Sequence, residues 1–278
     1  MRPALIVRRA ARYLSRHDVE SPLANAEILL ANVLGTDRAG LYTRDEGLSS
    51  AEAKRFGRAL CRRCTGVPVQ HLTGEQGFRR LMLAVRPGVF VPRPETEILV
   101  EHALAAIAGT SAPTVVDVGT GTGAIALAIK DERPDARVLA IDVSSDAVAS
   151  ARENAARSAL VVEVLAGDLL DPLPPELRGA VDLVVGNPPY VEEHELATLS
   201  REARADPVLA LAGGISIYED LFAAAADVLR ARGAVAVEIG EAQGAAVRAA
   251  AARAGLVAVE VHPDLAGRDR VVTARMAA

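Results

Sequence analysis

Hydrophobic and polar residues follow one another along this chain in two different patterns. From residue 1 to about residue 75, apolar side chains recur every three to four positions, most clearly in residues 5–14 and 24–34. That spacing is the period of an amphipathic helix. A third helix of the same kind is expected over residues 50–64. The first part of the chain is therefore predicted to be a small helical bundle.

The pattern changes after this bundle to glycine, proline and short alternating segments. Residues 78–91 are predicted to form a β-hairpin, with one arm ending at Val85 and a turn at Arg86-Pro87-Gly88. Residues 92–97 then open a helix, with acidic side chains in its first turn as the helix dipole prefers. This apolar stretch is expected to lie against the following domain as a connector.

Beyond residue 114, short Val-rich runs alternate with helical segments. This alternation predicts an α/β fold: a doubly wound, mostly parallel, Rossmann-like sheet of seven strands with helices on both faces. Only a loop joins the last two strands, which predicts an antiparallel hairpin at the sheet edge. The strands are expected near residues 115–118, 138–141, 161–165, 181–185, 234–239, 257–261 and 271–274. We expect three parts: a helical domain (1–76), a β-hairpin connector (77–94) and the α/β domain (95–278).

Composition narrows the class of protein. Half of the 278 residues are hydrophobic, but no apolar run approaches the roughly 20 residues needed to span a bilayer. Charged residues flank a core of only three apolar residues at the N-terminus, which is not a signal peptide. These features predict a soluble, cytoplasmic protein, and we expect it to be a monomer.

Charge is unevenly distributed along the chain. Residues 1–82 carry 14 Lys and Arg against 8 Asp and Glu, a net charge of +6, whereas the remainder carries 17 against 28. The basic part either faces an acidic partner or RNA, or is a solvated helical surface. The acidic remainder argues against a surface that wraps a nucleic-acid duplex, so no direct nucleic-acid binding is expected.

The cysteines and histidines show no pattern of metal ligands. Cys61 and Cys64 are three residues apart on a predicted helix, without a second pair or a nearby His. The five His are scattered along the chain. No metal site is expected.

The four residues Asn187-Pro188-Pro189-Tyr190 directly follow a predicted buried strand. The prolines prevent further strand pairing, so Asn187 is held at the carboxyl end of the strand, where open α/β sheets bind ligands. The Asn side chain offers an acceptor oxygen, the neighbouring carbonyls also accept, and Tyr190 adds a flat face. Together they form a receptacle for a planar NH2 group. An ordinary strand-ending turn is the alternative interpretation of this short motif.

A glycine-rich loop and two acidic residues follow the first three strands of the predicted sheet. The loop lets the backbone approach a ligand at a helix N-terminus, and its Gly-x-Gly-x-Gly pattern differs from the dinucleotide fingerprint. Asp142 can accept both hydroxyls of a ribose, and Asp168 with Leu169 can take the edge and face of an adenine. Three such strand ends fit S-adenosylmethionine better than NAD. The expected cofactor-binding residues are Gly119, Thr120, Gly121, Thr122, Gly123, Asp142, Asp168, Leu169 and Asn187.

These motifs resemble the signature set of class I S-adenosylmethionine-dependent methyltransferases that act on planar amino groups. More narrowly, Pro68–Gly74, Phe90–Glu97 and Asp264–Arg270 are similar to the protein-(glutamine-N5) methyltransferases of peptide chain release factors. The resemblance runs from about residue 5 to residue 275. It implies an enzyme that uses S-adenosylmethionine to methylate the glutamine of the Gly-Gly-Gln loop of release factors. One segment, 211–218, is shorter than the family pattern, which also has Glu-Pro at Asp206-Pro207.

The residues suggest how such a transfer proceeds. The Asn187 side-chain oxygen and the Pro188 carbonyl are expected to accept the two amide hydrogens, which aims the nitrogen at the methyl group. Tyr190 is expected to pack on the amide plane, with Pro189 and Phe90 completing the substrate pocket. No general base is required, because the amide proton becomes acidic only after methyl transfer.

Two other functions fit part of the pattern. A DNA or RNA amino-methyltransferase, acting on adenine N6 or cytosine N4, shares the glycine loop and the Asn-Pro-Pro-Tyr motif. It should also carry a basic, aromatic-bearing recognition region, and aromatic residues are only 3% of this chain. A regulatory module that only binds the cofactor has no use for an intact Asn-Pro-Pro-Tyr motif.

Overall fold

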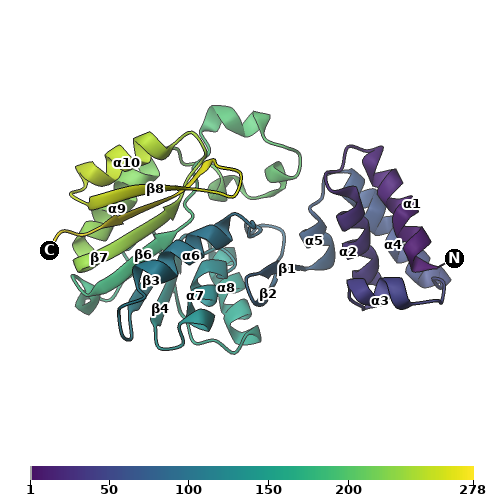
Figure 1. The fold of residues 1–278 in the computed structure, drawn as a ribbon, viewed down its shortest axis with the longest axis horizontal. Coiled ribbons are helices and arrows are strands. Elements are labelled where there is room, and N and C mark those ends of the chain that lie inside the picture. The colour runs from purple at the N-terminus through teal and green to yellow at the C-terminus, as the bar shows by residue number, and fades with distance from the viewer. Residues whose placement is uncertain (1) are drawn as a thin grey trace. The chain divides into compact units, whose positions relative to one another are not determined.

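The computed structural model describes residues 2–278, which divide into two compact units (Figure 1). The first contains the residues up to Glu75 together with a short segment, Ser200–Ala205. The second contains Gln76–Leu199 and Asp206–Ala278. No helix in the described part of the chain has the length and hydropathy that a membrane span needs.

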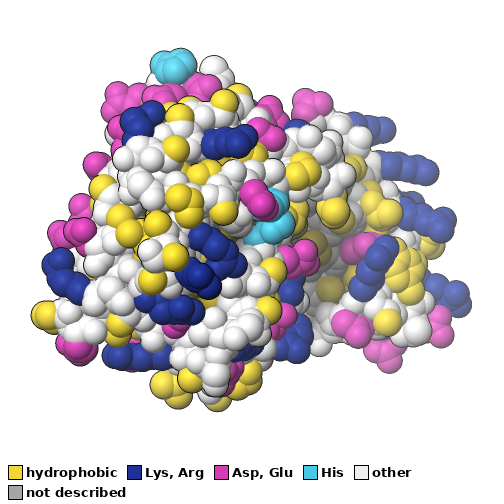
Figure 2. Space-filling model, turned by 60° about the vertical axis from the view of Figure 1, so that its left-hand side comes forward, with side chains coloured by type: hydrophobic (Ala, Val, Ile, Leu, Met, Phe, Trp, Pro, Cys, Tyr) yellow, Lys and Arg dark blue, Asp and Glu magenta, His cyan; other side chains and the backbone are white. Residues whose placement is uncertain are grey.

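The N-terminal unit is a helical bundle, as the sequence predicts. Its helices are α1 (Pro3–Ser15), α2 (Pro22–Leu34), α3 (Arg38–Thr43), α4 (Ser50–Cys64) and α5 (Val69–Thr73). The apolar positions of the helical period form its core, where Leu14, Leu30 and Leu41 are fully buried. A capping box between Ser49 and Glu52 begins α4. Figure 2 shows Lys and Arg side chains along the outer edge of this unit, at the right of the view.

A buried arginine connects the segment Ser200–Ala205 to the rest of this unit. Arg63 on α4 is only 4% exposed. Its guanidinium donates to Asn25 Oδ1 at 2.7 Å and forms an ion pair with Glu202. A buried cation needs such partners because its desolvation is costly. The segment therefore belongs to the N-terminal unit although it is distant in sequence.

In residues 76–278, all of which the structure describes, seven strands form one sheet in the order β5-β4-β3-β6-β7-β9-β8. Neighbours from β5 to β7 run parallel, whereas β9 is antiparallel to both β7 and β8. The parallel sheet and the antiparallel edge hairpin confirm the sequence prediction. The strands are β3 (Thr114–Val118), β4 (Arg137–Asp142), β5 (Glu163–Ala166), β6 (Val181–Gly186), β7 (Leu229–Glu238), β8 (Val257–Pro263) and β9 (Asp269–Arg275).

Helices cover both faces of this sheet, so its central strands are apolar on both sides. Within β3, Val116 packs into a core with α9 (Ser216–Val228) and α10 (Gly244–Arg253). Its neighbour Val115 packs into a second core on the opposite face. The helices of that second face are α6 (Thr96–Ala106), α7 (Ala124–Glu132) and α8 (Ser145–Arg157).

The predicted connector hairpin is wrong in its turn and its second arm. The observed strands are β1 (Glu75–Phe78) and β2 (Leu81–Ala84), so the chain reverses at Arg79-Arg80 and residues 89–91 form no strand. Alternating apolar residues across this turn had predicted one continuous arm. The turn forms instead because Arg79 takes the left-handed conformation, with φ at 52°.

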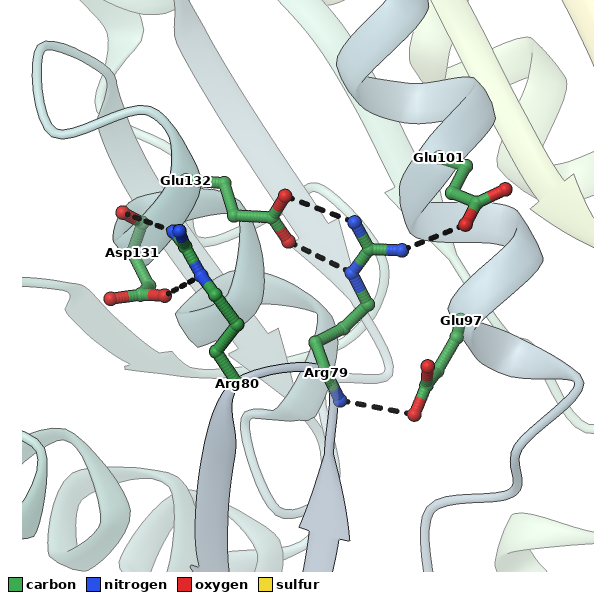
Figure 3. Close-up of polar contacts among 6 residues, drawn as sticks. All are labelled: Arg79, Arg80, Glu97, Glu101, Asp131 and Glu132. Carbon is green, nitrogen blue, oxygen red and sulfur yellow. Dashed lines mark hydrogen bonds and ion pairs between the residues drawn. The ribbon is translucent and has the colours of Figure 1, made fainter.

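Ion pairs hold the reversed chain against two helices of the sheet domain (Figure 3). The Arg79 guanidinium donates to both carboxylate oxygens of Glu132 on α7, at 2.8 and 2.9 Å. It also reaches Glu101 on α6 at 3.0 Å, while its backbone N–H donates to Glu97 Oε1 at 3.0 Å. Arg80 donates to Asp131 Oδ2 at 2.9 Å. The positive φ therefore places one guanidinium between two helices.

Candidate active site

A cavity of about 370 Å³ lies at the carboxyl ends of the parallel strands. Every residue predicted for cofactor or substrate lines it except Gly123. Gly123 instead begins α7 with φ at 84°, where a Cβ would lie 3.3 Å from Ala151. The structure thus gathers the other predicted residues at one place. Gly123 instead lets the glycine loop pack closely against Ala151 of the neighbouring helix.

The glycine loop is bound by its own neighbours rather than presenting a ring of free N–H groups. The N–H groups of Gly119 and Thr120 both donate to the Ile141 carbonyl, at 2.9 and 3.0 Å. The Gly121 N–H donates to Asp142 Oδ2 at 2.8 Å. Gly119 and Gly121 have φ values of 69° and 56°. These amides are not available to a pyrophosphate, which separates this loop from a dinucleotide cradle.

A buried carboxylate under the loop holds its shape. Asp117 is fully buried at the end of β3 and accepts from the Thr120 hydroxyl at 2.6 Å and the Ala126 N–H at 3.1 Å. Burial raises the pKa of Asp117 to about 7, against the opposing effect of these hydrogen bonds. Its Oδ1 has no hydrogen-bond partner among the described residues. Asp117 therefore stabilises the loop from below.

A second buried side chain, Asn154 on α8, joins the loop to the connector hairpin. Its amide nitrogen donates to the carbonyls of Thr122 and Ala84, at 2.9 and 3.0 Å, and its oxygen accepts the Ala84 N–H at 2.8 Å. This amide is 1% exposed. Its three hydrogen bonds hold the end of β2 beside the glycine loop, a connection that no sequence pattern indicated.

The two acidic residues at the next strand ends differ in environment. Asp142 accepts the Gly121 N–H through Oδ2 and the Ser144 N–H through Oδ1, at 2.8 and 2.9 Å. Burial raises the pKa of its carboxyl, and these hydrogen bonds oppose the shift. Asp168 is exposed at the rim, beside Leu169 with φ at 43°. Each Asp142 oxygen keeps a lone pair for a hydroxyl group of a ligand.

Close packing of two strands places the Asn-Pro-Pro-Tyr motif against the glycine loop. Gly186 pairs with Val118, and a Cβ on Gly186 would lie 2.6 Å from the Val118 carbonyl oxygen. The Asn187 carbonyl therefore comes within 4.0 Å of where a Gly119 Cβ would stand. Tyr190 is fixed by its carbonyl, which accepts from Gln243 Nε2 at 2.9 Å. Burial raises the pKa of Tyr190 to about 12, so its phenol is neutral.

A buried carboxylate supports the opposite wall of the cavity. Asp206 accepts the Val91 N–H at 3.2 Å and pairs with Arg93. The Arg93 guanidinium carbon in turn lies 5.2 Å from the centroid of the Phe90 ring, a cation–π distance. Phe90 is thereby held at the cavity by the Arg93 side chain, and Asp206 fixes both that side chain and the backbone of Val91. The sequence marked Asp206 only as a departure from the family pattern.

The segment 211–218, which the resemblance singled out, lies along the cavity. Val191 pairs with Ala212 in an isolated bridge, where its N–H donates to the Leu211 carbonyl at 2.8 Å. Gly213 leaves no room for a side chain, because a Cβ there would lie 2.0 Å from the Pro189 carbonyl oxygen. The segment therefore packs directly on the Asn-Pro-Pro-Tyr backbone.

Sequence reasoning missed two polar residues beside Asn187. Thr96 lines the cavity at the start of α6 and accepts from Asn187 Nδ2 at 3.4 Å. Glu238 at the end of β7 is 2% exposed, and the Thr96 side chain lowers the pKa of its carboxyl against the larger effect of burial. The signal for Thr96 was its place in the Arg-Pro-Glu-Thr-Glu block, residues 93–97 of the family-like stretch Phe90–Glu97. Nothing local to Glu238 distinguished it from other strand-ending acidic residues.

Comparison with known proteins identifies relatives along the whole chain. Residues 6–74 match the family model described as PrmC N-terminal domain, and residues 81–249 match Methyltransferase small domain. The release factor glutamine methyltransferase of Mycolicibacterium smegmatis is 44% identical over 95% of this chain and 94% of its own length. That of Deinococcus radiodurans is 42% identical over 98% of both chains. That of Moorella thermoacetica is 42% identical over 94% of both.

Solved structures share the fold at lower identity. A T. thermophilus 16S rRNA methyltransferase in complex with AdoMet and guanosine has a TM-score of 0.55 at 19% identity, over 73% of this chain and 49% of its own. The catalytic domain of hMettl16 in complex with a 3′UTR hairpin has a TM-score of 0.56 at 15% identity, over 82% of both chains. These likenesses support the methyltransferase fold of the sheet domain.

Proposed function

Because this chain belongs to the family of release factor glutamine methyltransferases, we propose that it methylates the side-chain amide nitrogen, N5, of the Gly-Gly-Gln glutamine of release factors. The observation that carries the proposal is the position of Asn187–Tyr190, inside the cavity and against the glycine loop. That arrangement places acceptors for an amide NH2 beside the expected cofactor site.

The residues around the glycine loop fit S-adenosylmethionine. Asp142 keeps acceptor lone pairs for ribose hydroxyls, and Asp168 with Leu169 lies at the next strand end for the adenine. Gly119 and Gly121 leave space for a ligand, while the loop amides make internal hydrogen bonds and need no phosphate. The bound cofactor supplies an electrophilic methyl group on a sulfonium.

The chain's own residues then orient and polarise the glutamine amide. Asn187 Oδ1 and the Pro188 carbonyl accept the two amide hydrogens, which directs the nitrogen towards the methyl group and stabilises the positive charge that grows there. Tyr190 packs on the amide plane as a neutral phenol, since its pKa of about 12 keeps it protonated. Phe90, held by Arg93, closes the pocket. The products are N5-methylglutamine and S-adenosylhomocysteine.

The basic N-terminal unit supplies the second part of the proposal. Its residues contact the release factor outside the Gln loop, supported by the net charge of +6 over residues 1–82. On α4 the exposed Arg58 and Arg62 line a hollow of about 320 Å³ with apolar Val33 and Leu72 in its wall. Such a surface suits an acidic protein segment, whose charge complements arginine.

The direct test of the activity is methyl transfer from labelled S-adenosylmethionine to purified release factor. The loop Gln→Ala variant of the factor and duplex DNA serve as parallel substrates. Label on the wild-type factor alone is expected, and it identifies both the substrate and the acceptor residue. Label on DNA instead would assign the chain to the amino-methyltransferases of nucleic acid, and label on the Gln→Ala factor would exclude the proposed acceptor.

A second measurement tests the role of the N-terminal unit. The pair of substitutions Arg58→Glu and Arg62→Glu should raise KM for the intact factor by about tenfold, the effect of losing roughly 1.4 kcal/mol of electrostatic attraction. A short peptide containing Gly-Gly-Gln should keep its kinetics, since it does not reach α4. An unchanged KM for the intact factor would show that this surface is merely solvated.

A further inference from the structure

The side chains of Asn187, Thr96 and Glu238 follow one another as a polar series, which begins at Asn187 and extends away from the cavity. Asn187 Nδ2 lies 3.4 Å from Thr96 Oγ1, and the Thr96 hydroxyl in turn lowers the pKa of the Glu238 carboxyl, which is the effect of a hydroxyl that donates to a carboxylate. Thr96 and Glu238 are 3% and 2% exposed, so water does not compete for these groups. They come from α6, from β7 and from the loop after β6, which only the folded sheet domain brings together.

The chemistry of these groups fixes the direction of the hydrogen bonds in the polar series. An ionised carboxylate can only accept hydrogen bonds, so the single hydroxyl hydrogen of Thr96 must go to Glu238. Thr96 then offers Asn187 only a lone pair. The NH2 group of Asn187 can use that lone pair, whereas its oxygen cannot. The Asn187 nitrogen is therefore held on Thr96, and Oδ1 is left for the cavity.

The surroundings of Glu238 allow it to lose or gain a proton near neutrality. Burial raises its pKa to about 7, the Thr96 hydrogen bond and the charges of Arg270 and Arg93 oppose the rise, and the charge of Glu95 adds to it. The Tyr190 and Tyr218 phenols also face this carboxyl: burial is the main cause that raises the pKa of both, and the negative charge of Glu238 adds to the rise. Glu238 Oε2 has no hydrogen-bond partner among residues 2–278 as described. A protonated Glu238 can donate to Thr96, which frees the hydroxyl hydrogen and removes the fixed direction.

We propose that Thr96 and Glu238 are positioning residues for methyl transfer, which set the orientation of the Asn187 amide so that Oδ1 faces the substrate NH2 group. This assignment rests on the proposed function of Asn187. It gives a role to the threonine of the Arg-Pro-Glu-Thr-Glu block and to a buried acid outside every motif of the sequence. Deprotonated Glu238 is the active form, because only a carboxylate enforces the direction of the Thr96 hydrogen bond.

The kinetic test uses three variants of the full chain with intact release factor. Thr96→Val, which removes the hydroxyl at almost constant shape, should lower kcat by about 10- to 100-fold, the usual effect of misplacing a reacting group. Glu238→Gln should lower kcat comparably, while Thr96→Ser should stay within a few-fold of wild type. KM for S-adenosylmethionine should change little in all three, because none of these side chains belongs to the cofactor residues.

The pH profile separates positioning from mere stability. Wild-type kcat should fall below about pH 7 as Glu238 gains its proton, and Glu238→Gln should lack that fall at a uniformly low rate. A profile that keeps the same acidic limb in Glu238→Gln, or a Thr96→Val variant with wild-type kcat, would overturn the proposal. A thermal unfolding curve for each variant identifies any loss of kcat that comes from unfolding.

A spectroscopic readout stands apart from the substrate. In nitrogen-15 NMR, the side-chain NH2 signals of Asn187, assigned by comparison with an Asn187→Asp variant, should shift with pH near 7 in the wild-type chain but not in Glu238→Gln. If release factor is not methylated while this shift is present, the proposed substrate is wrong and the positioning role of Thr96 and Glu238 is supported. If the factor is methylated and the Asn187 signals do not shift with pH, the positioning role of Thr96 and Glu238 is wrong.

Discussion

Arg79 offers a quantitative test of how the connector hairpin is held on the sheet domain. Its guanidinium makes two hydrogen bonds to Glu132, and the two side chains are 18% and 20% exposed. Charge-assisted bonds contribute about 1.5 to 3 kcal/mol each when buried, and less when water reaches them. The contact to Glu101 adds little, since that carboxylate is 66% exposed. We expect Arg79→Ala to lower the free energy of unfolding by about 2 kcal/mol.

The adjacent residue provides a matched control. Arg80 belongs to the same turn and pairs with Asp131, but its side chain is 63% exposed. Arg80→Ala should therefore cost less than about 0.5 kcal/mol. In thermal unfolding, Arg79→Ala should lower Tm by about 4 to 8 °C, at 2 to 4 °C per kcal/mol for a domain of this size. Equal shifts for the two variants would refute the assignment of the stability to the Glu132 pair.

Acid provides an internal check on the same pair. Hydrogen bonding to Arg79 lowers the pKa of Glu132 below its ordinary value in the folded chain. A carboxyl with a lowered folded pKa contributes stability above its unfolded pKa and loses that contribution as pH falls. The difference in unfolding free energy between wild type and Arg79→Ala should therefore shrink as pH falls below about 4.5. A difference that is constant down to acid pH would mean that packing of the arginine stem, and not its charge, stabilises the turn.

Three further predictions concern the site and the edge of the sheet. Asn187→Ala should lower kcat by about 100- to 1000-fold, while its affinity for the cofactor stays within a few-fold of wild type. If equilibrium binding of the cofactor fell as steeply as kcat, the assignment of Asn187 to the substrate amide would be refuted. Gly213→Ala should lower turnover at least tenfold in the same assay, about 1.4 kcal/mol, because its Cβ would meet the Pro189 carbonyl oxygen at 2.0 Å. The stacked rings of His102 and His262, whose centroids are 3.9 Å apart, predict that the edge of the sheet at β8 is sensitive to acid. Burial first, and the charge of His262 second, lower the pKa of His102. The contribution of His102 to the free energy of unfolding is therefore present above about pH 6.5 and is lost as pH falls. In urea unfolding, the free energy of unfolding of His102→Gln should depend less on pH below about 6.5 than that of wild type. An equal pH dependence in the two proteins would exclude the histidine pair as the source of the acid sensitivity.

The sheet and most of the cavity were predictable because their signals are local. Short, continuous Val-rich runs and a glycine loop directly after a strand constrain their own structure, and parallel strands bring their carboxyl ends to one edge. The hairpin turn was not predictable, because Arg79 adopts a positive φ in exchange for contacts with helices that begin 17 residues or more further along the chain. Thr96 and Glu238 were missed for a related reason. Their role depends on the direction of a hydrogen bond between three separate elements, and no single segment carries that information.

The buried Arg63 has a consequence for the order in which this protein is completed during synthesis. The ribosome releases the N-terminal helices first, yet the carboxylate that neutralises Arg63 lies 139 residues later, at Glu202. Until that segment emerges, the bundle must hold a cation with only the neutral partners Asn25 and Val67. An uncompensated buried charge weakens a fold. The first unit to be made is therefore finished only after most of the sheet domain has been translated.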